Sequence, residues 1–175
     1  MTNLNQLPVD LPIPQDDGST KHLMGMRLPA LSLRSTSGEN ISLDEIKGKL
    51  VIYCYPMTGQ PNVALPDGWD QIPGARGCTP QSCAFRDHYQ ELQELGAQVI
   101  GLSVQSTEYQ KEMVDRLHLP FPVVSDAEYH LQQSFNHAKP IGGLTTHAAH
   151  VVACHGVAHH NLRRNSLAFT LCEQT

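Results

Sequence analysis

The sequence has little positive charge: 12 Lys and Arg residues stand against 17 Asp and Glu residues, and the formal net charge is -5. Nucleic acids and membrane surfaces are polyanions whose partners need a basic face, so this balance argues against both. The chain also lacks an apolar run of the roughly 18 to 20 residues that a bilayer span needs, which excludes a transmembrane protein. The first 20 residues contain no Lys or Arg and no apolar core. We therefore expect no secretory signal and a cytoplasmic location.

Cysteine occurs five times in 175 residues, an odd number for a chain of ordinary size. A secreted disulfide scaffold is normally shorter and evenly paired, so reactive or incidental thiols are favoured over structural bridges. The length fits one domain with a core of its own.

Three segments differ in composition. Residues 1–23 are rich in Pro, Asn, Gln and Asp, which is typical of an extended leader. Residues 24–136 carry the alternating pattern of a folded domain. Residues 137–175 form an atypical C-terminal segment with six of the ten His residues and a net charge of +2 (three basic minus one acidic), against -7 for residues 1–136 (nine minus sixteen). A frameshift in the source gene or unusual divergence would explain the break after Asn136.

Apolar runs and helical periodicities alternate along the middle segment. Strands are expected at 31–33, 50–55, 99–104 and 121–124, and helices at 42–47, 79–95, 106–117 and 127–135. The first of these helices would open on a capping box at Ser42, and Thr79 would cap the second. This order predicts an α/β fold with parallel strands and right-handed crossovers. Residues 149–162 allow a further hairpin with its turn at 155–156.

A long connection over residues 56–77, rich in Pro and Gly, leads to Cys78. Loops of that length in a compact domain are commonly functional. Cys78 stands at the start of a predicted helix, where free N–H groups and the helix dipole favour a thiolate, and Arg76 adds a nearby cation. We expect Cys78 to be the most nucleophilic thiol of the chain.

Cys83 follows five residues later, about 200° around the helix from Phe85 and off the apolar face that Phe85 defines. In a continuous helix the Cα atoms of residues five apart are roughly 8 to 9 Å apart, whereas a disulfide needs about 4.4 to 6.8 Å. A bridge between Cys78 and Cys83 would require the first helical turn to unwind. Four intervening residues are also a poor spacing for zinc ligands.

Several short motifs in order resemble the peroxiredoxins of the AhpC/TSA superfamily, closest to the bacterioferritin-comigratory or Q type. The resemblance covers about residues 25–135 and rests on Ser35-Thr36-Ser37-Gly38, Lys47-Gly48-Lys49-Leu50, Tyr53-Cys54-Tyr55-Pro56, Gly77-Cys78-Thr79 with Cys83-Ala84-Phe85-Arg86-Asp87, and Leu119-Pro120-Phe121-Pro122 with Ser125-Asp126.

The resemblance implies a thioredoxin-like fold with a central mixed sheet flanked by helices. It implies a thiol-dependent peroxidase in which Cys78 is the peroxidatic cysteine, attacking hydrogen peroxide or an organic hydroperoxide, and Cys83 the resolving cysteine. Thioredoxin or a similar dithiol would be the reductant, and no metal or organic cofactor is needed.

The chain departs from the family pattern in two respects. Where the family keeps a Pro seven residues and a Thr three residues before the peroxidatic cysteine, this chain has Gln71 and Ala75. Pro56 and Thr58 are the candidate equivalents if the long connection loops out. The late-strand Arg of the family falls at 146–148, Thr-His-Ala here, with Arg76, Arg163 and Arg164 as possible substitutes.

Two other functions stay open. One is a redox sensor or thiol–disulfide exchanger of the same fold with impaired peroxidase activity. The other is a metal-binding module built on Cys154, His155, His159 and His160, although histidines in a solvated tail explain that group more simply. Of the remaining residues, Cys54 is expected to be a buried core residue, Trp69 to pack down the long connection, and His88 to lie at the surface.

Overall fold

The structure, a computed structural model, describes residues 27–71, 75–135, 149–154 and 157–161. The leader expected over residues 1–23 lies outside these ranges. Among the described residues, no helix combines the length and the apolar character that crossing a membrane requires.

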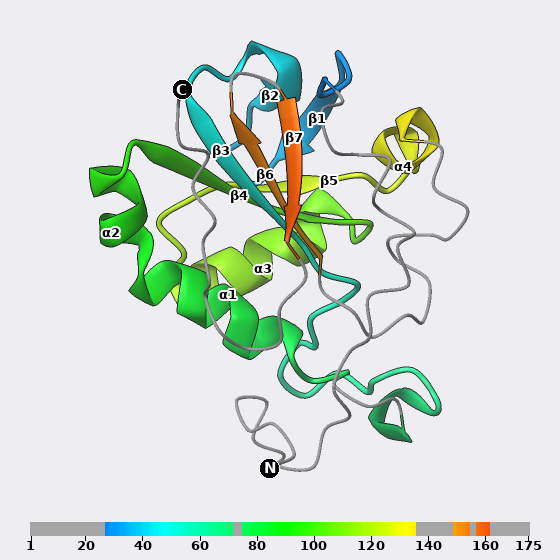
Figure 1. The fold of residues 1–175 in the computed structure, drawn as a ribbon. Helices are drawn as coiled ribbons and strands as arrows, with labels where there is room; N and C mark the ends of the chain where they lie inside the picture. The colour runs from blue at the N-terminus through cyan, green and yellow to red at the C-terminus, as the bar shows by residue number, and fades with distance from the viewer. Residues whose placement is uncertain (1–26, 72–74, 136–148, 155–156, 162–175) are drawn as a thin grey trace.

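A mixed sheet of seven strands forms the centre of the described fold, in the order β2-β1-β5-β4-β3-β6-β7 (Figure 1). Its three central strands run parallel: β3 (Lys49–Cys54), β4 (Ala97–Ser103) and β5 (Val123–Ser125). The other four pair antiparallel on either side: β1 (Ser32–Ser35), β2 (Asn40–Ser42), β6 (Ala149–Cys154) and β7 (Val157–Asn161). The expected mixed sheet flanked by helices is confirmed.

Strand β3 is buried on both faces, as its unbroken apolar run predicts. Because side chains alternate along a strand, Val51 and Tyr53 enter one apolar cluster while Leu50, Ile52 and Cys54 enter the other. The sheet therefore separates two cores, and the one containing Tyr53 also contains Cys78.

Helices cover both faces of the sheet (Figure 1). The face with Tyr53 is covered by α1 (Cys78–Asp87), α2 (Tyr89–Glu94) and α3 (Thr107–Leu117), which contribute Phe85, Leu92 and Met113 to its core. The opposite core takes residues from the 3-10 helix η2 (Leu43–Glu45) and the neighbourhood of α4 (His130–Ser134). A second 3-10 helix, η3 (Trp69–Gln71), lies in the long connection.

The helix start expected at Ser106 is confirmed, whereas the one expected at Ser42 has a different structure. Ser106 caps α3, its side chain accepting a hydrogen bond from the Tyr109 N–H. At Ser42 the expected capping box is wrong, because the helix that follows is a single 3-10 turn and the Ser42 side chain makes no capping hydrogen bond. A turn of three residues is too short to present the N–H groups that such a box satisfies.

The helix expected at residues 79–95 forms there, but it is divided in two and its expected cap at Thr79 is wrong. Gly77 takes the N-cap position and α1 begins at Cys78, so Thr79 lies inside the helix. The helix breaks at His88, whose ψ of 11° leaves the helical range, and α2 follows. Leu95 lies outside α2 and is 43% exposed, so it does not continue the buried face.

The C-terminal hairpin predicted at residues 149–162 is confirmed as β6 and β7. Strand β6 pairs with β3 along its whole length, from Lys49 opposite Cys154 to Cys54 opposite Ala149. Strand β7 pairs with β6, and the expected turn at 155–156 lies outside the described residues. The segment set apart by its composition thus covers the open edge of β3.

Candidate active site around Cys78

The first residue of α1 is Cys78, and Cys83 lies on the same helix. Because α1 runs without interruption from Cys78 to Asp87, the ideal separation of roughly 8 to 9 Å between their Cα atoms applies. The helix places the two candidate cysteines near one another and keeps them beyond disulfide reach.

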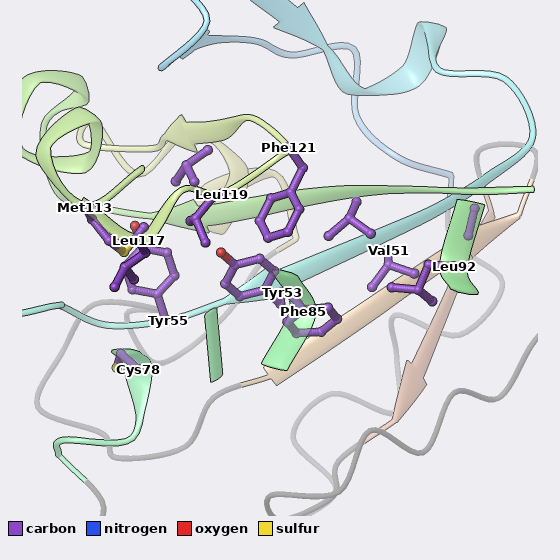
Figure 2. Packing of buried hydrophobic residues seen from close by; sticks show 13 residues of the cluster. Val51, Tyr53, Tyr55, Cys78, Phe85, Leu92, Met113, Leu117, Leu119 and Phe121 are labelled. Atoms are coloured by element: carbon purple, nitrogen blue, oxygen red, sulfur yellow. The ribbon is translucent and has the colours of Figure 1, made fainter. Parts of the chain in front are cut away.

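Cys78 is buried, with 5% of its surface exposed. It belongs to the apolar cluster that β3 and α1 to α3 share, and Figure 2 shows it at the Tyr55 end of that cluster. A thiol in such surroundings is well protected from water and from large reagents.

Burial outweighs the helix end in setting the acidity of Cys78. Loss of hydration raises the pKa of its thiol from 9.0 to about 11, although the backbone N–H groups of Met57 and of Cys78 itself donate to the sulfur and act in the opposite direction. In this conformation burial thus outweighs the expected stabilisation of the Cys78 thiolate by the helix N-terminus. Two donors do not compensate for the low polarity around the sulfur.

The segment after β3 supplies the polar contact to Cys78. Met57 provides the N–H that reaches the sulfur, and the next residue, Thr58, is 1% exposed. Gln105, two residues after the end of β4, accepts from the Thr58 N–H at 3.0 Å and donates to the Thr58 carbonyl at 3.3 Å. This places Thr58, one of the two candidate equivalents for the family positions, beside the residue that contacts Cys78.

Cys83 is half-buried and packs against the same apolar cluster as Cys78. The prediction that Cys83 lies off the apolar face of the helix is thus wrong in part, because the side of α1 that carries Cys83 also contacts the apolar cluster. Arg86, one turn further along, contacts Cys83. The hydrogen bond with Asp87 raises the pKa of the Arg86 guanidinium, and Cys83 raises it by a smaller amount.

Arg86 also fixes the C-terminal half of α1. Its Nη1 donates to the Leu117 carbonyl at 2.9 Å, and its Nε donates to Asp87 Oδ1 at 2.8 Å. The carbonyl lies at the end of α3, where the helix dipole favours a cation. The half of α1 that follows Cys83 is therefore tied to α3.

Aromatic stacking positions the middle of α1 on the sheet. The Phe85 ring stacks on the Tyr53 ring, with 4.5 Å between the ring centroids (Figure 2). The Tyr53 hydroxyl donates to Ser82 Oγ at 3.4 Å, and Ser82 Oγ donates to the Cys78 carbonyl at 3.0 Å. Contacts from β3 thus reach the first turn of α1.

The other residues singled out from the sequence lie where expected. Cys54 is buried on the opposite face of the sheet, and burial raises the pKa of its thiol to about 12. Trp69 is 7% exposed and packs the long connection down. The His88 side chain is 45% exposed, and its Nδ1 lies 3.0 Å from Glu91 Oε2.

Several candidates fall outside what the structure describes. These are residues 146–148, where the family pattern has its late-strand Arg, together with Arg163 and Arg164. The side chains of the Cys154 group are also outside it, so the metal-module hypothesis is untested. Among the described residues, no three His, Cys, Asp or Glu side chains gather as metal ligands.

Sequence reasoning missed Gln105, Ser82 and Tyr53. Gln105 and Thr58 are 47 residues apart, so no local pattern joins them. Tyr53 was placed in the central strand, but nothing in the strand pattern shows that its hydroxyl meets a helix. A Ser four residues after a functional cysteine on one helix was the one available signal, since a Ser side chain there can bond back to the carbonyl.

Comparison with known proteins agrees with this geometry. The Redoxin family profile matches residues 23–165. Two curated relatives are Peroxiredoxin Bcp of Bacillus subtilis, 33% identical over 114 residues, and the chloroplastic Peroxiredoxin Q of Sedum lineare, 34% identical over 116 residues. The alignments cover 65% and 66% of this chain, and 63% and 54% of the relatives. The chain thus spans less than two thirds of the length of these relatives.

Solved structures show the same fold. Peroxiredoxin Q of Xanthomonas campestris aligns over 81% of this chain and 89% of its own, with a TM-score of 0.60 and 22% sequence identity. AhpC of Enterococcus faecalis aligns over 84% and 83%, with a TM-score of 0.62 and 16% identity. The described sheet and helices are those of a thioredoxin-like fold.

Proposed function

The chain belongs to the Redoxin family, and from that premise we propose that it is a thiol-dependent peroxidase with Cys78 as the peroxidatic and Cys83 as the resolving cysteine. One observation carries the proposal: a cysteine at the first position of α1 receives two backbone N–H bonds at its sulfur, and a second cysteine lies on the same helix. Relatives named as peroxiredoxins of the Q and Bcp type support it.

The first step is oxidation of Cys78 by a peroxide. The thiolate attacks one peroxide oxygen, the O–O bond breaks, and the leaving oxygen takes a proton to become water or an alcohol. Sulfur loses two electrons and becomes a sulfenic acid, while the peroxide gains two. The two N–H groups at the Cys78 sulfur stabilise the attacking thiolate.

The second step joins the two cysteines. The Cys83 thiolate attacks the Cys78 sulfur, the S–O bond breaks, and hydroxide leaves and is protonated to water. A dithiol protein such as thioredoxin then reduces the disulfide by exchange and returns both thiols. A cytoplasmic location belongs to the same proposal, because the cycle needs a reducing pool.

The test is replacement of Cys78 by Ser, followed with hydrogen peroxide and thioredoxin as the reducing system. We expect peroxide consumption to fall to the level of a no-protein control. Cys54→Ser is the matched control, because Cys54 is buried on the other face of the sheet and should leave turnover unchanged. Full turnover in Cys78→Ser would refute the proposal.

A redox sensor or thiol–disulfide exchanger is the second candidate. The observation that favours it is the burial of Cys78, which raises its pKa to about 11 and slows attack on peroxide. Mass spectrometry after one equivalent of peroxide separates the two functions. Loss of two hydrogens at the Cys78–Cys83 pair within seconds supports the peroxidase, whereas oxidation at the rate of an ordinary thiol supports the sensor.

A further inference from the structure

The entry to the long connection is held by side chains of one other segment. Thr58 is bound three times by Gln105: its N–H donates to Oε1 at 3.0 Å, its carbonyl accepts from Nε2 at 3.3 Å, and its hydroxyl donates to Oε1 at 3.4 Å. A side-chain amide that pairs with both the N–H and the C=O of one residue fixes the orientation of that residue's two peptide planes.

The next two residues are held by α3. The Gly59 carbonyl accepts from Arg116 Nη2 at 3.1 Å, and Arg116 is itself oriented by Glu112, with 2.7 Å between Nε and Oε1. The backbone of Gln60 contacts the Tyr109 hydroxyl. Three consecutive loop residues are therefore anchored, each by a different side chain, to α3 and the turn before it.

This anchoring bears directly on Cys78. The Met57 N–H, which donates to the Cys78 sulfur, belongs to the peptide before Met57. The peptide after Met57 carries the Thr58 N–H from which Gln105 accepts, so Gln105 anchors Met57 from its C-terminal side. Gln105 makes no contact of this kind itself; it holds the Thr58 N–H and C=O, and so sets the direction of the chain that presents the Met57 N–H. Hydrogen bonds to a charged sulfur weaken steeply when the donor turns away.

We propose that Gln105 is a positioning residue of the active site, which by pairing with Thr58 keeps the Met57 N–H on the sulfur of Cys78. The inference rests on the proposed function, in which Cys78 reacts as a thiolate.

The experiment measures the alkylation of Cys78 by iodoacetamide at pH 8 to 9, resolved by peptide mass spectrometry, in the full chain carrying Gln105→Met. Methionine keeps the volume and removes the hydrogen bonds. We expect the Cys78 rate constant to fall about tenfold, the effect of a rise of one pKa unit. The matched control is Gln98→Met, because Gln98 is an exposed residue of β4 whose Nε2 donates to the Lys47 carbonyl. Its rate should equal that of the wild type.

Cys54 reports on the fold in the same samples. If Gln105→Met merely loosened the protein, the buried thiols of Cys78 and Cys54 would both alkylate faster, which is the opposite sign. In that event the Cys78 alkylation rate of Gln105→Asn decides between loosening and loss of the hydrogen bonds, since Asn keeps the amide group on a side chain one methylene shorter. An unchanged or higher Cys78 rate in both variants overturns the proposal. The readout involves no peroxide, so failure of the peroxidase function is seen separately, as unchanged peroxide consumption in Cys78→Ser.

Discussion

The acidity of Cys78 predicts an unusual dependence of peroxide reduction on pH. Only the thiolate attacks peroxide, and the raised pKa of about 11 leaves about one molecule in 10⁴ ionised at pH 7, against about one in 10² at the ordinary pKa of 9.0. The rate constant of the peroxide reaction should follow this thiolate fraction. It should rise about tenfold for each pH unit from 7 to 10.

The assay is a single-turnover reaction of the reduced protein with hydrogen peroxide in a stopped-flow instrument. Trp69 is the single tryptophan of the chain and lies buried in the long connection, so its fluorescence is a suitable signal. Traces from Cys78→Ser are subtracted to remove slow oxidation at other thiols. A rate constant that is level between pH 6 and 9 would refute the reasoning, because the thiolate would then be fully formed despite its burial.

The same shift has a consequence for stability. The folded-state pKa of Cys78 lies above the value in the unfolded chain, so the thiol costs nothing below about pH 9 and opposes folding as the pH rises toward 11. Two pKa units correspond to about 2.7 kcal/mol. The urea midpoint of the wild type should therefore fall over this interval more than that of Cys78→Ser, which has no thiol to ionise.

Two further changes test the resolving cysteine and the packing beneath it. Cys83→Ser should consume one equivalent of peroxide and then stop, leaving a Cys78 sulfenic acid that dimedone labels; continued turnover with thioredoxin would exclude Cys83 as the resolving residue. Gly101→Ala would place a Cβ 2.7 Å from Tyr53 Oη and 2.8 Å from its Cζ, and should destabilise the fold by about 1 to 3 kcal/mol in urea denaturation. An unchanged urea midpoint would show that the Tyr53 ring moves aside freely.

The central strands could be predicted because their signal is local. The apolar run from Leu50 to Tyr55 has no polar break, and a strand buried on both faces needs none. The same holds for the Ser106 cap and for the terminal hairpin, where short-range patterns and structure agree. Each of these elements is defined by residues within a few positions of one another.

The environment of Cys78 could not be predicted for the opposite reason. The sequence places it at a helix start, which favours a thiolate, but its burial depends on Tyr55 and on α3, which are distant from it in the sequence. The helix breaks at His88 without a Pro or Gly that would have predicted the break. Packing against residues distant in the sequence outweighs the local effect of the helix start, so that the pKa of the Cys78 thiol is raised and not lowered.

The two halves of α1 have different anchors, and this relates the acidity of Cys78 to the proposed disulfide. After Cys83 the helix is tied to α3 by the bond from Arg86 to the Leu117 carbonyl, whereas its first turn is held to the sheet through Ser82 and Tyr53. A disulfide requires that first turn to unwind, because roughly 8 to 9 Å separates the two Cα atoms in a helix. The same movement takes Cys78 out of the apolar cluster and restores water to its sulfur. Unwinding should thus lower the pKa of Cys78 and bring Cys78 toward Cys83, so that one local transition controls the disulfide-forming step of the cycle.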